Sequence, residues 1–241
     1  MIAVIETTPD QWIVWSGHGV HLTATVMYTW IVMAVLLLAS ILITSRLKDD
    51  EKPSRWQNAV EVLVVGIRDQ IREVSGQDPG PYLPFVGTLF LFIATSALLE
   101  VVPFFRTPTG SLSTTTALAV CVFVAVPLYG ITQRGLRTYL AGYIKPTPLM
   151  LPFNILGELT RTIALAIRLY GNMMSGAVIV AILLSLTPFL FPLVMQLLGL
   201  LTGMIQAYIF AVLATVYIAS SAHAVEQTQA RAQALSPPPP D

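Results

Sequence analysis

Residues 148 to 187 read PLMLPFNILGELTRTIALAIRLYGNMMSGAVIVAILLSLT and contain no convincing helix break. A helix of this length measures about 60 Å, whereas the hydrocarbon core of a bilayer is about 30 Å thick. Such a helix cannot stand upright in a membrane, so we expect it to be strongly tilted. Pro188 and Pro192 mark a turn, after which residues 189 to 223 predict a second over-long helix that runs back antiparallel.

Arg168 lies inside this apolar stretch, far from either end. A guanidinium group stays charged at every physiological pH, and placing it in hydrocarbon costs several kcal/mol. An ionisable residue at such a position indicates a functional role.

The composition agrees with a membrane location. Hydrophobic residues make up 55% of the chain and charged residues 11%, against roughly 25% charged in an ordinary soluble domain. The mean hydropathy is +0.72. The single cysteine, Cys121, excludes an intrachain disulfide. The first residues lack a basic region followed by an apolar core, so we expect no cleaved signal peptide.

Three more apolar stretches are each long enough to span a bilayer once. They cover residues 21 to 44, 82 to 105 and 112 to 133. The second contains one acid, Glu100, and the third contains no charge. Together with the tilted pair they give about five membrane helices.

Two segments differ from these. Residues 53 to 74 place apolar side chains at helical spacing within a charged segment, which predicts an amphipathic helix on the membrane surface. Residues 230 to 241 are polar and proline-rich, so we expect them to be disordered. The predicted fold class is an all-α integral membrane protein, a single membrane domain over residues 1 to 241.

The basic residues between the spans predict the orientation. One side carries only Arg106. The other side carries Arg46, Lys48, Lys52, Arg55, Arg68, Arg72, Arg134, Arg137, Lys145 and Arg231. Because basic loops stay in the cytoplasm, we expect the N-terminus outside and the C-terminus in the cytoplasm.

Polar residues of the first long helix recur at steps of three and four, with Leu165 as the one interruption. They are Asn154, Glu158, Arg161, Arg168, Asn172 and Ser175. This spacing places them on one helix face. In a bilayer such a stripe either pairs with a neighbouring helix or lines a water-filled route. Residues 189 to 223 contain no acid, so we expect another subunit to supply the counter-charge of Arg168.

Three segments of the chain carry a resemblance to a known family. The residues PTPLMLPFNILGELTRTIALAIRLYGNMMSG and GLLTGMIQAYIFAVLATVYIASSAHA come from the two over-long helices, and LLEVVPFFRTPTGSLSTTTALAV spans the turn between the second and third apolar stretches. The first two segments are similar to the last two helices of the subunit a family of F-type ATP synthases, and the third resembles that family's middle region. The likeness covers roughly residues 80 to 223, and the cores RLYGN and QAYIF stand in the family's order.

The resemblance implies a non-catalytic stator subunit through which ions cross a membrane, in contact with a ring of c subunits and with peripheral stalk (b-type) subunits. It implies an energy-coupling membrane, such as a bacterial inner membrane. Arg168 takes the place of the family's essential arginine, which separates two aqueous half-channels. Candidates for the outward half-channel are Glu100, Asn172 and Gln206, with Ser113 and Thr115 as weaker ones, and candidates for the cytoplasmic half-channel are Asn154, Glu158 and Arg161.

Some alternatives stay open for these residues. Asn172 and Gln206 could simply hydrogen-bond across the helix pair, and Glu158 with Arg161 could form a local ion pair. Many family members carry a glutamate where this chain has Ala177, and a histidine or an acid near Gly199. Both relay groups are missing here, and a path without them suits either a proton carried along water or a hydrated sodium ion. We expect protons, because the proton is the commoner ion in the resembled family, with a sodium-translocating subunit as the alternative. A self-contained secondary transporter is a further alternative, although the internal repeats of such proteins are missing.

Other kinds of site find little support. No glycine-rich phosphate loop is present, so we expect no ATP binding by this chain. His18, His21 and His223 are isolated, so we expect no metal site and no cofactor. We expect no catalytic residues of the chain's own.

Overall fold

The computed structural model describes residues 13–17, 20–45, 55–76, 78–102, 105–136, 150–186 and 190–234. Its first element is a short antiparallel hairpin formed by β1 (Ile13–Gly17) and β2 (Val20–Thr23), in which Ser16 pairs with His21. The sequence analysis did not anticipate this hairpin. The expected all-α class is confirmed, because every long element that follows is a helix. His18 lies outside the described residues.

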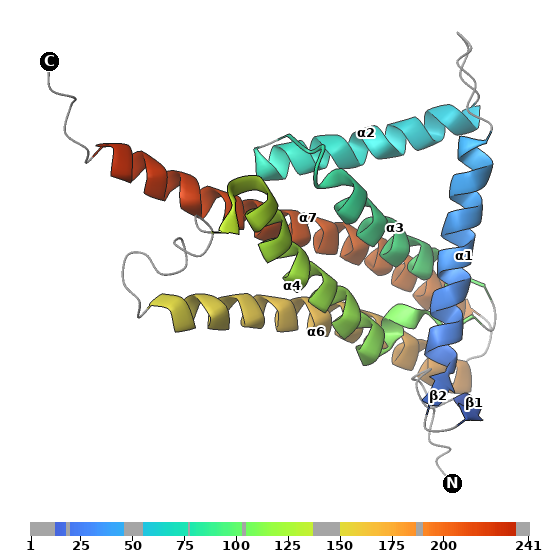
Figure 1. The fold of residues 1–241 in the computed structure, drawn as a ribbon. Coiled ribbons are helices and arrows are strands. Elements are labelled where there is room, and N and C mark those ends of the chain that lie inside the picture. The colour runs from blue at the N-terminus through green and yellow to red at the C-terminus, as the bar shows by residue number, and fades with distance from the viewer. Residues whose placement is uncertain are drawn as a thin grey trace, which may run out of the picture.

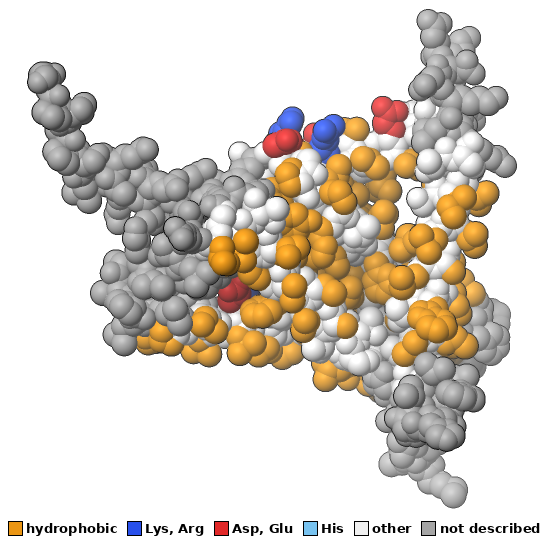
Figure 2. All heavy atoms as spheres, in the orientation of Figure 1, with side chains coloured by type: hydrophobic (Ala, Val, Ile, Leu, Met, Phe, Trp, Pro, Cys, Tyr) orange, Lys and Arg blue, Asp and Glu red, His pale blue; other side chains and the backbone are white. Residues whose placement is uncertain are grey.

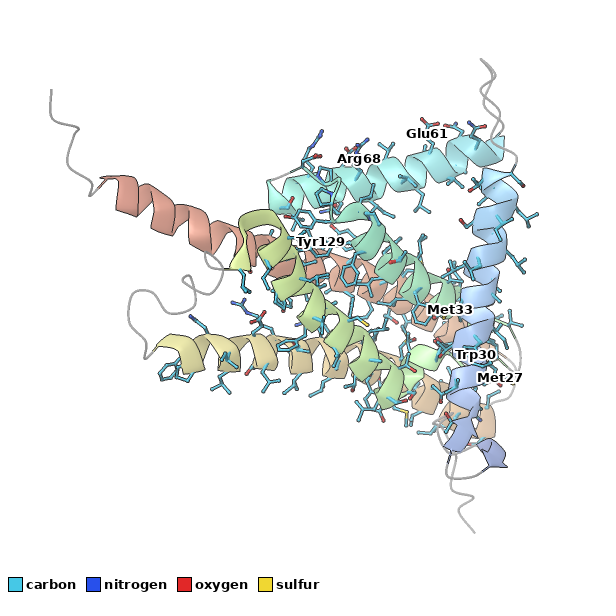
Figure 3. The ribbon with its side chains drawn as sticks, in the orientation of Figure 1. Met27, Trp30, Met33, Glu61, Arg68 and Tyr129 are labelled. Atoms are coloured by element: carbon cyan, nitrogen blue, oxygen red, sulfur yellow. The ribbon has the colours of Figure 1, made fainter. Side chains whose placement is uncertain are left out.

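Four helices are long and apolar enough to cross a membrane, judged by length and composition over the described residues. The spans lie at Ala24–Thr44, Leu112–Thr132, Pro152–Ser185 and Leu193–Ser220. The first two belong to α1 (Ala24–Thr44) and α4 (Leu112–Arg134). Met27, Trp30 and Met33 on α1 (Figure 3) are exposed, Trp30 by 65%. Large apolar side chains left bare in this way are typical of a surface that lipid or another membrane protein covers.

The apolar stretch at 82 to 105 gives a shorter helix than the sequence predicts. Helix α3 covers Leu83–Leu99, and Glu100 is its C-cap. The chain then turns, with the amide of Val101 donating to the carbonyl of Leu98, and it forms the 3-10 turn η2 (Pro108–Gly110) before α4. Pro103 disfavours helical backbone at the residue before it, which accounts for the early end. Glu100 therefore stands at a helix terminus rather than within a helix.

Helix α2 (Arg55–Ser75) is amphipathic and lies across one end of the bundle (Figure 1). Ile71 on its apolar side is buried against Tyr82 and Val86 at the start of α3. Glu61 and Arg68 are exposed on its opposite side (Figure 3). In Figure 2 acidic and basic side chains gather along this outer edge, whereas hydrophobic side chains cover most of the rest of the visible face. This distribution is typical of a helix at a membrane surface.

The two longest helices are α6 (Met150–Leu186) and α7 (Leu190–Ala234), with 37 and 45 residues. They run antiparallel and lie at a steep angle to α1 (Figure 1), as a tilted hairpin requires. The backbone of α7 stays helical to Ala234, past the end expected at 223 and into the segment expected to be disordered from 230. Residues 235 to 241 lie outside the described residues.

The core lies where α3, α4, α6 and α7 meet. Its most deeply buried large side chains include Ile93, Leu169 and Phe210. The helices approach closely at Gly203 of α7, where an added Cβ would lie 2.8 Å from the Cβ of Ala97 and 3.2 Å from the Cε of Met173. Glycine at this position therefore lets α3 and α6 pack closely against α7.

Candidate functional site

Arg168 lies on the face of α6 that points away from the core. Two neighbouring leucines are buried in the core: Leu165 is 1% exposed and Leu169 is 0% exposed. Since successive residues of a helix are about 100° apart, these two leucines turn Arg168 towards the surface, where its side chain is exposed. Within the described part of the chain, Arg168 makes no hydrogen bond or ion pair. Its charge is available to a group outside this subunit.

Asn172 connects the two long helices one turn beyond Arg168. Its side-chain Nδ2 donates to the backbone carbonyl of Thr202, 3.3 Å away. Because α6 and α7 are antiparallel (Figure 1), a step from Asn172 to Arg168 corresponds to a step from Thr202 to Gln206. Gln206 therefore lies at about the level of Arg168 along the helix pair.

Gln206 is a buried amide, 5% exposed, on α7. Its Nε2 has no hydrogen-bond partner among the described residues. A buried donor without a partner costs about 1 to 3 kcal/mol, so such groups normally bind water, an ion or a neighbouring molecule. The structure thus brings an unsatisfied donor to the level of the exposed arginine.

A cavity of about 520 Å³ opens between α1, η2, α6 and α7, and Glu100 lines it. The backbone carbonyl of Glu100 accepts a hydrogen bond from Nε2 of Gln196 on α7, at 3.0 Å. Tyr28 and Phe105, stacked edge to face with ring centroids 5.1 Å apart, form part of the wall. Of the acids among the described residues, Glu100 is the one that lines this cavity.

The same cavity is lined by Ala177 of α6 and Gly199 of α7, the two positions at which the resemblance led us to expect relay groups. The structure brings these small residues and Glu100 together, so a carboxyl group at any of the three would reach one space. Arg106 also lines the cavity. Sequence reasoning used Arg106 only for orientation, because nothing in the sequence shows that the loop folds back onto α6.

Ser113 and Thr115 form hydrogen bonds with Ser111 at the start of α4. The backbone amide of Ser113 donates to Oγ of Ser111, the N-cap, at 3.2 Å. The buried hydroxyl of Thr115 donates to the carbonyl of Ser111 at 3.2 Å. Neither residue lines the cavity that contains Glu100.

The polar stripe continues from Arg168 towards the N-terminal end of α6. Asn154 and Arg161 are exposed, whereas Glu158 is half-buried. The guanidinium carbon of Arg161 lies 5.5 Å from the centroid of the Tyr217 ring on α7. The three residues lie about 10 to 21 Å from Arg168 along the axis, at about 1.5 Å per residue. They are not brought to the cavity of Glu100.

The arrangement is thus an exposed cation halfway along a long helix, with a cavity that contains Glu100 and Arg106 towards one end and a polar stripe towards the other. No described residue pairs with this arginine, and an exposed charge within a membrane segment is typical of a surface that meets another protein or water. The fold and site therefore define an integral membrane protein with a charged group at mid-helix.

Comparison with known proteins identifies the family. Residues 26–219 match the family model described as ATP synthase A chain. The chain is 58% identical over 217 residues to ATP synthase subunit a 2 of Acaryochloris marina, covering 90% of this chain and 93% of the relative. It is 58% identical to ATP synthase subunit a of Nitrosospira multiformis (90% and 86% covered) and 55% identical to ATP synthase subunit a 2 of a Picosynechococcus species (93% and 97% covered). The chain belongs to the ATP synthase subunit a family.

Proposed function

We propose that this chain is the ion-translocating stator subunit of an F-type ATP synthase, and that Arg168 separates two half-channels within it. The observation that carries the proposal is the placement of Arg168. It is held on the outward face of α6 by two core leucines, and no acid of the described chain pairs with it. The partner that completes the site is the ring of c subunits, each with a carboxyl group within the membrane.

The chemistry follows from the permanent charge of arginine. A ring carboxyl group must be neutral where it faces lipid and ionised where it exchanges its ion. A fixed cation at the interface lowers the pKa of that carboxyl group there, and it repels a hydrated cation that would pass straight from one half-channel to the other. Lysine would serve less well, because it loses its proton more easily when desolvated.

The outward half-channel in this proposal is the cavity lined by Glu100, and it leads along α6 past Met173 towards Asn172 and Gln206. The free donor of Gln206 would hold water or a ring carboxylate near Arg168. The cytoplasmic half-channel follows Asn154, Glu158 and Arg161. The N-terminus is then outside, and the surface helix α2 and the C-terminus are cytoplasmic. Stalk subunits of the b type would complete the stator.

The proposed ion is the proton. Glu100 is the acid among the described residues that lines the cavity, and a proton can pass through water and a single carboxyl group. ATP-driven pumping by the reconstituted complex should therefore not require sodium. Stimulation by sodium that persists in the presence of an uncoupler would assign sodium instead.

The experiment that tests the proposed function is the substitution of Arg168 in the assembled complex. Arg168→Ala should abolish ion-coupled ATP synthesis, and Arg168→Lys should restore little of it. The exposed Arg68 of α2 provides a matched control, and Arg68→Ala should leave the rate unchanged within about twofold. Wild-type coupling in the Arg168→Ala complex would refute the proposal.

A further inference from the structure

The contact between Arg161 and Tyr217 links the polar stripe of α6 to the facing helix α7. The guanidinium carbon lies 5.5 Å from the ring centroid, within the range of a cation–π interaction. We propose that Tyr217 is a positioning residue of the cytoplasmic half-channel, which holds Arg161 as a second fixed cation on the route between Arg168 and the cytoplasm. This inference rests on the proposed function and adds a residue to it.

Tyr217 is well suited to hold another side chain. Its ring is half-buried and packs against both core clusters, the one around Phe210 and Ala214 and the one around Ala211 and Ile218. The ring is therefore fixed by the core while one face remains available to the cation. Arg161, in contrast, is exposed and has a long side chain that would sample many rotamers without such a contact.

The contact matters for ion transfer because Arg161 lies between Arg168 and the cytoplasmic end of the polar stripe. Arg161 and Arg168 are seven residues apart, so they lie on one face of α6 about 10.5 Å apart along the axis. A ring carboxyl group that has left Arg168 and opens to the cytoplasmic half-channel still lies near a positive charge. That charge favours the ionised carboxylate and hence release of the ion to the cytoplasmic side. If the Tyr217 ring is removed, the Arg161 side chain samples many rotamers, and its stabilisation of the ionised ring carboxylate weakens.

A double-mutant cycle in the whole ATP synthase, reconstituted in lipid vesicles, tests the inference. Tyr217→Leu and Arg161→Gln should each lower coupled ATP synthesis about three- to tenfold, the range expected for a lost cation–π contact. The double variant should be no slower than the slower single variant, because both changes remove the same interaction. Tyr217→Phe keeps the ring face and should stay within about twofold of the wild-type rate.

If the role of Tyr217 is purely structural, the cycle gives a different result. The fold-reductions in coupled ATP synthesis of Tyr217→Leu and Arg161→Gln then multiply in the double variant, and this outcome would overturn the inference. An unchanged rate in Tyr217→Leu, or a loss in Tyr217→Phe equal to that in Tyr217→Leu, would overturn it as well. Rates are normalised to the amount of assembled complex. If Tyr217→Leu does not assemble, Tyr217→Met removes the ring with a flexible apolar side chain and enters the same cycle.

Arg168→Ala, measured in parallel, separates this inference from the proposed function. Full coupling in Arg168→Ala would refute the proposed function and the inference with it. Loss of coupling in Arg168→Ala together with a multiplicative cycle would refute only the role of Tyr217.

Discussion

The position of Arg168 is set by the packing of neighbouring residues of α6 and not by a hydrogen bond or ion pair of its own with a described residue. Leu165 and Leu169 are buried almost completely, and inside a membrane such side chains hold helices together by van der Waals packing. These two contacts fix the rotation of α6 about its axis. The arginine, which no described residue neutralises, is carried to the surface by that rotation. The cost of its exposure within a membrane is met only when another subunit covers it.

A second prediction about a single residue concerns Glu100. If it is the proton-accepting group of the outward cavity, Glu100→Gln should slow coupled ATP synthesis by about tenfold or more, because a positioned proton acceptor is lost while the size of the side chain is kept. The measurement is the rate of ATP synthesis by energised vesicles. Glu61→Gln, on the exposed side of α2, is the matched control and should behave as wild type.

The geometry of the cavity also predicts a rescue. Ala177 lines the same space as Glu100. A carboxyl group at residue 177 can therefore reach the water that Glu100 serves, and Ala177→Glu should restore a measurable part of the rate lost in Glu100→Gln. Unchanged rates in Glu100→Gln alone would return Glu100 to the structural role of a helix C-cap.

The sequence predicted some of these residues and not others, for a physical reason. The charge of Arg168 and the stripe from Asn154 to Ser175 were visible because helical spacing and hydropathy are local properties of the chain. The contact of Arg161 with Tyr217 and the shared cavity of Arg106 with Glu100 depend on how distant segments pack. Spacing along one helix carries no information about them.

At the scale of elements, the tilted helix pair followed from length alone, since α6 and α7 are both longer than a membrane is thick. The extent of α3 was predicted less well. The apolar stretch extends to residue 105, but the helix ends at Leu99 and the chain turns there. Pro103 accounts for this early end, because it disfavours helical backbone at the residue before it. Val101 and Val102, directly after Glu100, belong to that turn. Hydropathy reports where a segment is apolar, and it does not report where the backbone leaves the helix.

The crossing of α3, α6 and α7 supports a second prediction. Gly203→Ala should destabilise the membrane sector by about 1 to 3 kcal/mol, the usual cost of overpacking, because the new Cβ would lie 2.8 Å from that of Ala97. Gly87→Ala is the matched control. Gly87 is also buried in a helix, but its Cβ would meet no atom within 4 Å, so the change should be neutral or stabilising by up to about 1 kcal/mol.

Thermal unfolding of the purified membrane sector in detergent would measure both variants. Equal midpoints for Gly203→Ala and Gly87→Ala would show that the three helices do not meet as closely as this structure places them.

At the scale of the molecule, the two ends of the bundle differ. The β1–β2 hairpin lies at one end and the amphipathic helix α2 at the other (Figure 1). The cavity of Glu100 is near the hairpin end, since it is lined by η2 and by Tyr28 in the first turns of α1. The exposed charges of α2 lie at the opposite end. The proposed half-channels therefore require a fixed orientation in the membrane.

Labelling with a membrane-impermeant maleimide tests this orientation. In a Cys121→Ala background, a cysteine in place of Glu61 on α2 should react only from the cytoplasmic side. A cysteine in place of Ser16 in the hairpin should react only from the outside. The reversed pattern would exchange the two half-channels and contradict the proposed direction of ion entry.

The account depends most on what meets Arg168 in the assembled complex. The direct measurement is a cryo-electron microscopy structure of the whole ATP synthase that resolves this side chain. We predict that the guanidinium of Arg168 faces a carboxyl group of the c-ring across the interface, within about 4 Å or through one water. A guanidinium that faces lipid, or that binds an acid of its own chain while the ring passes elsewhere, would contradict the account.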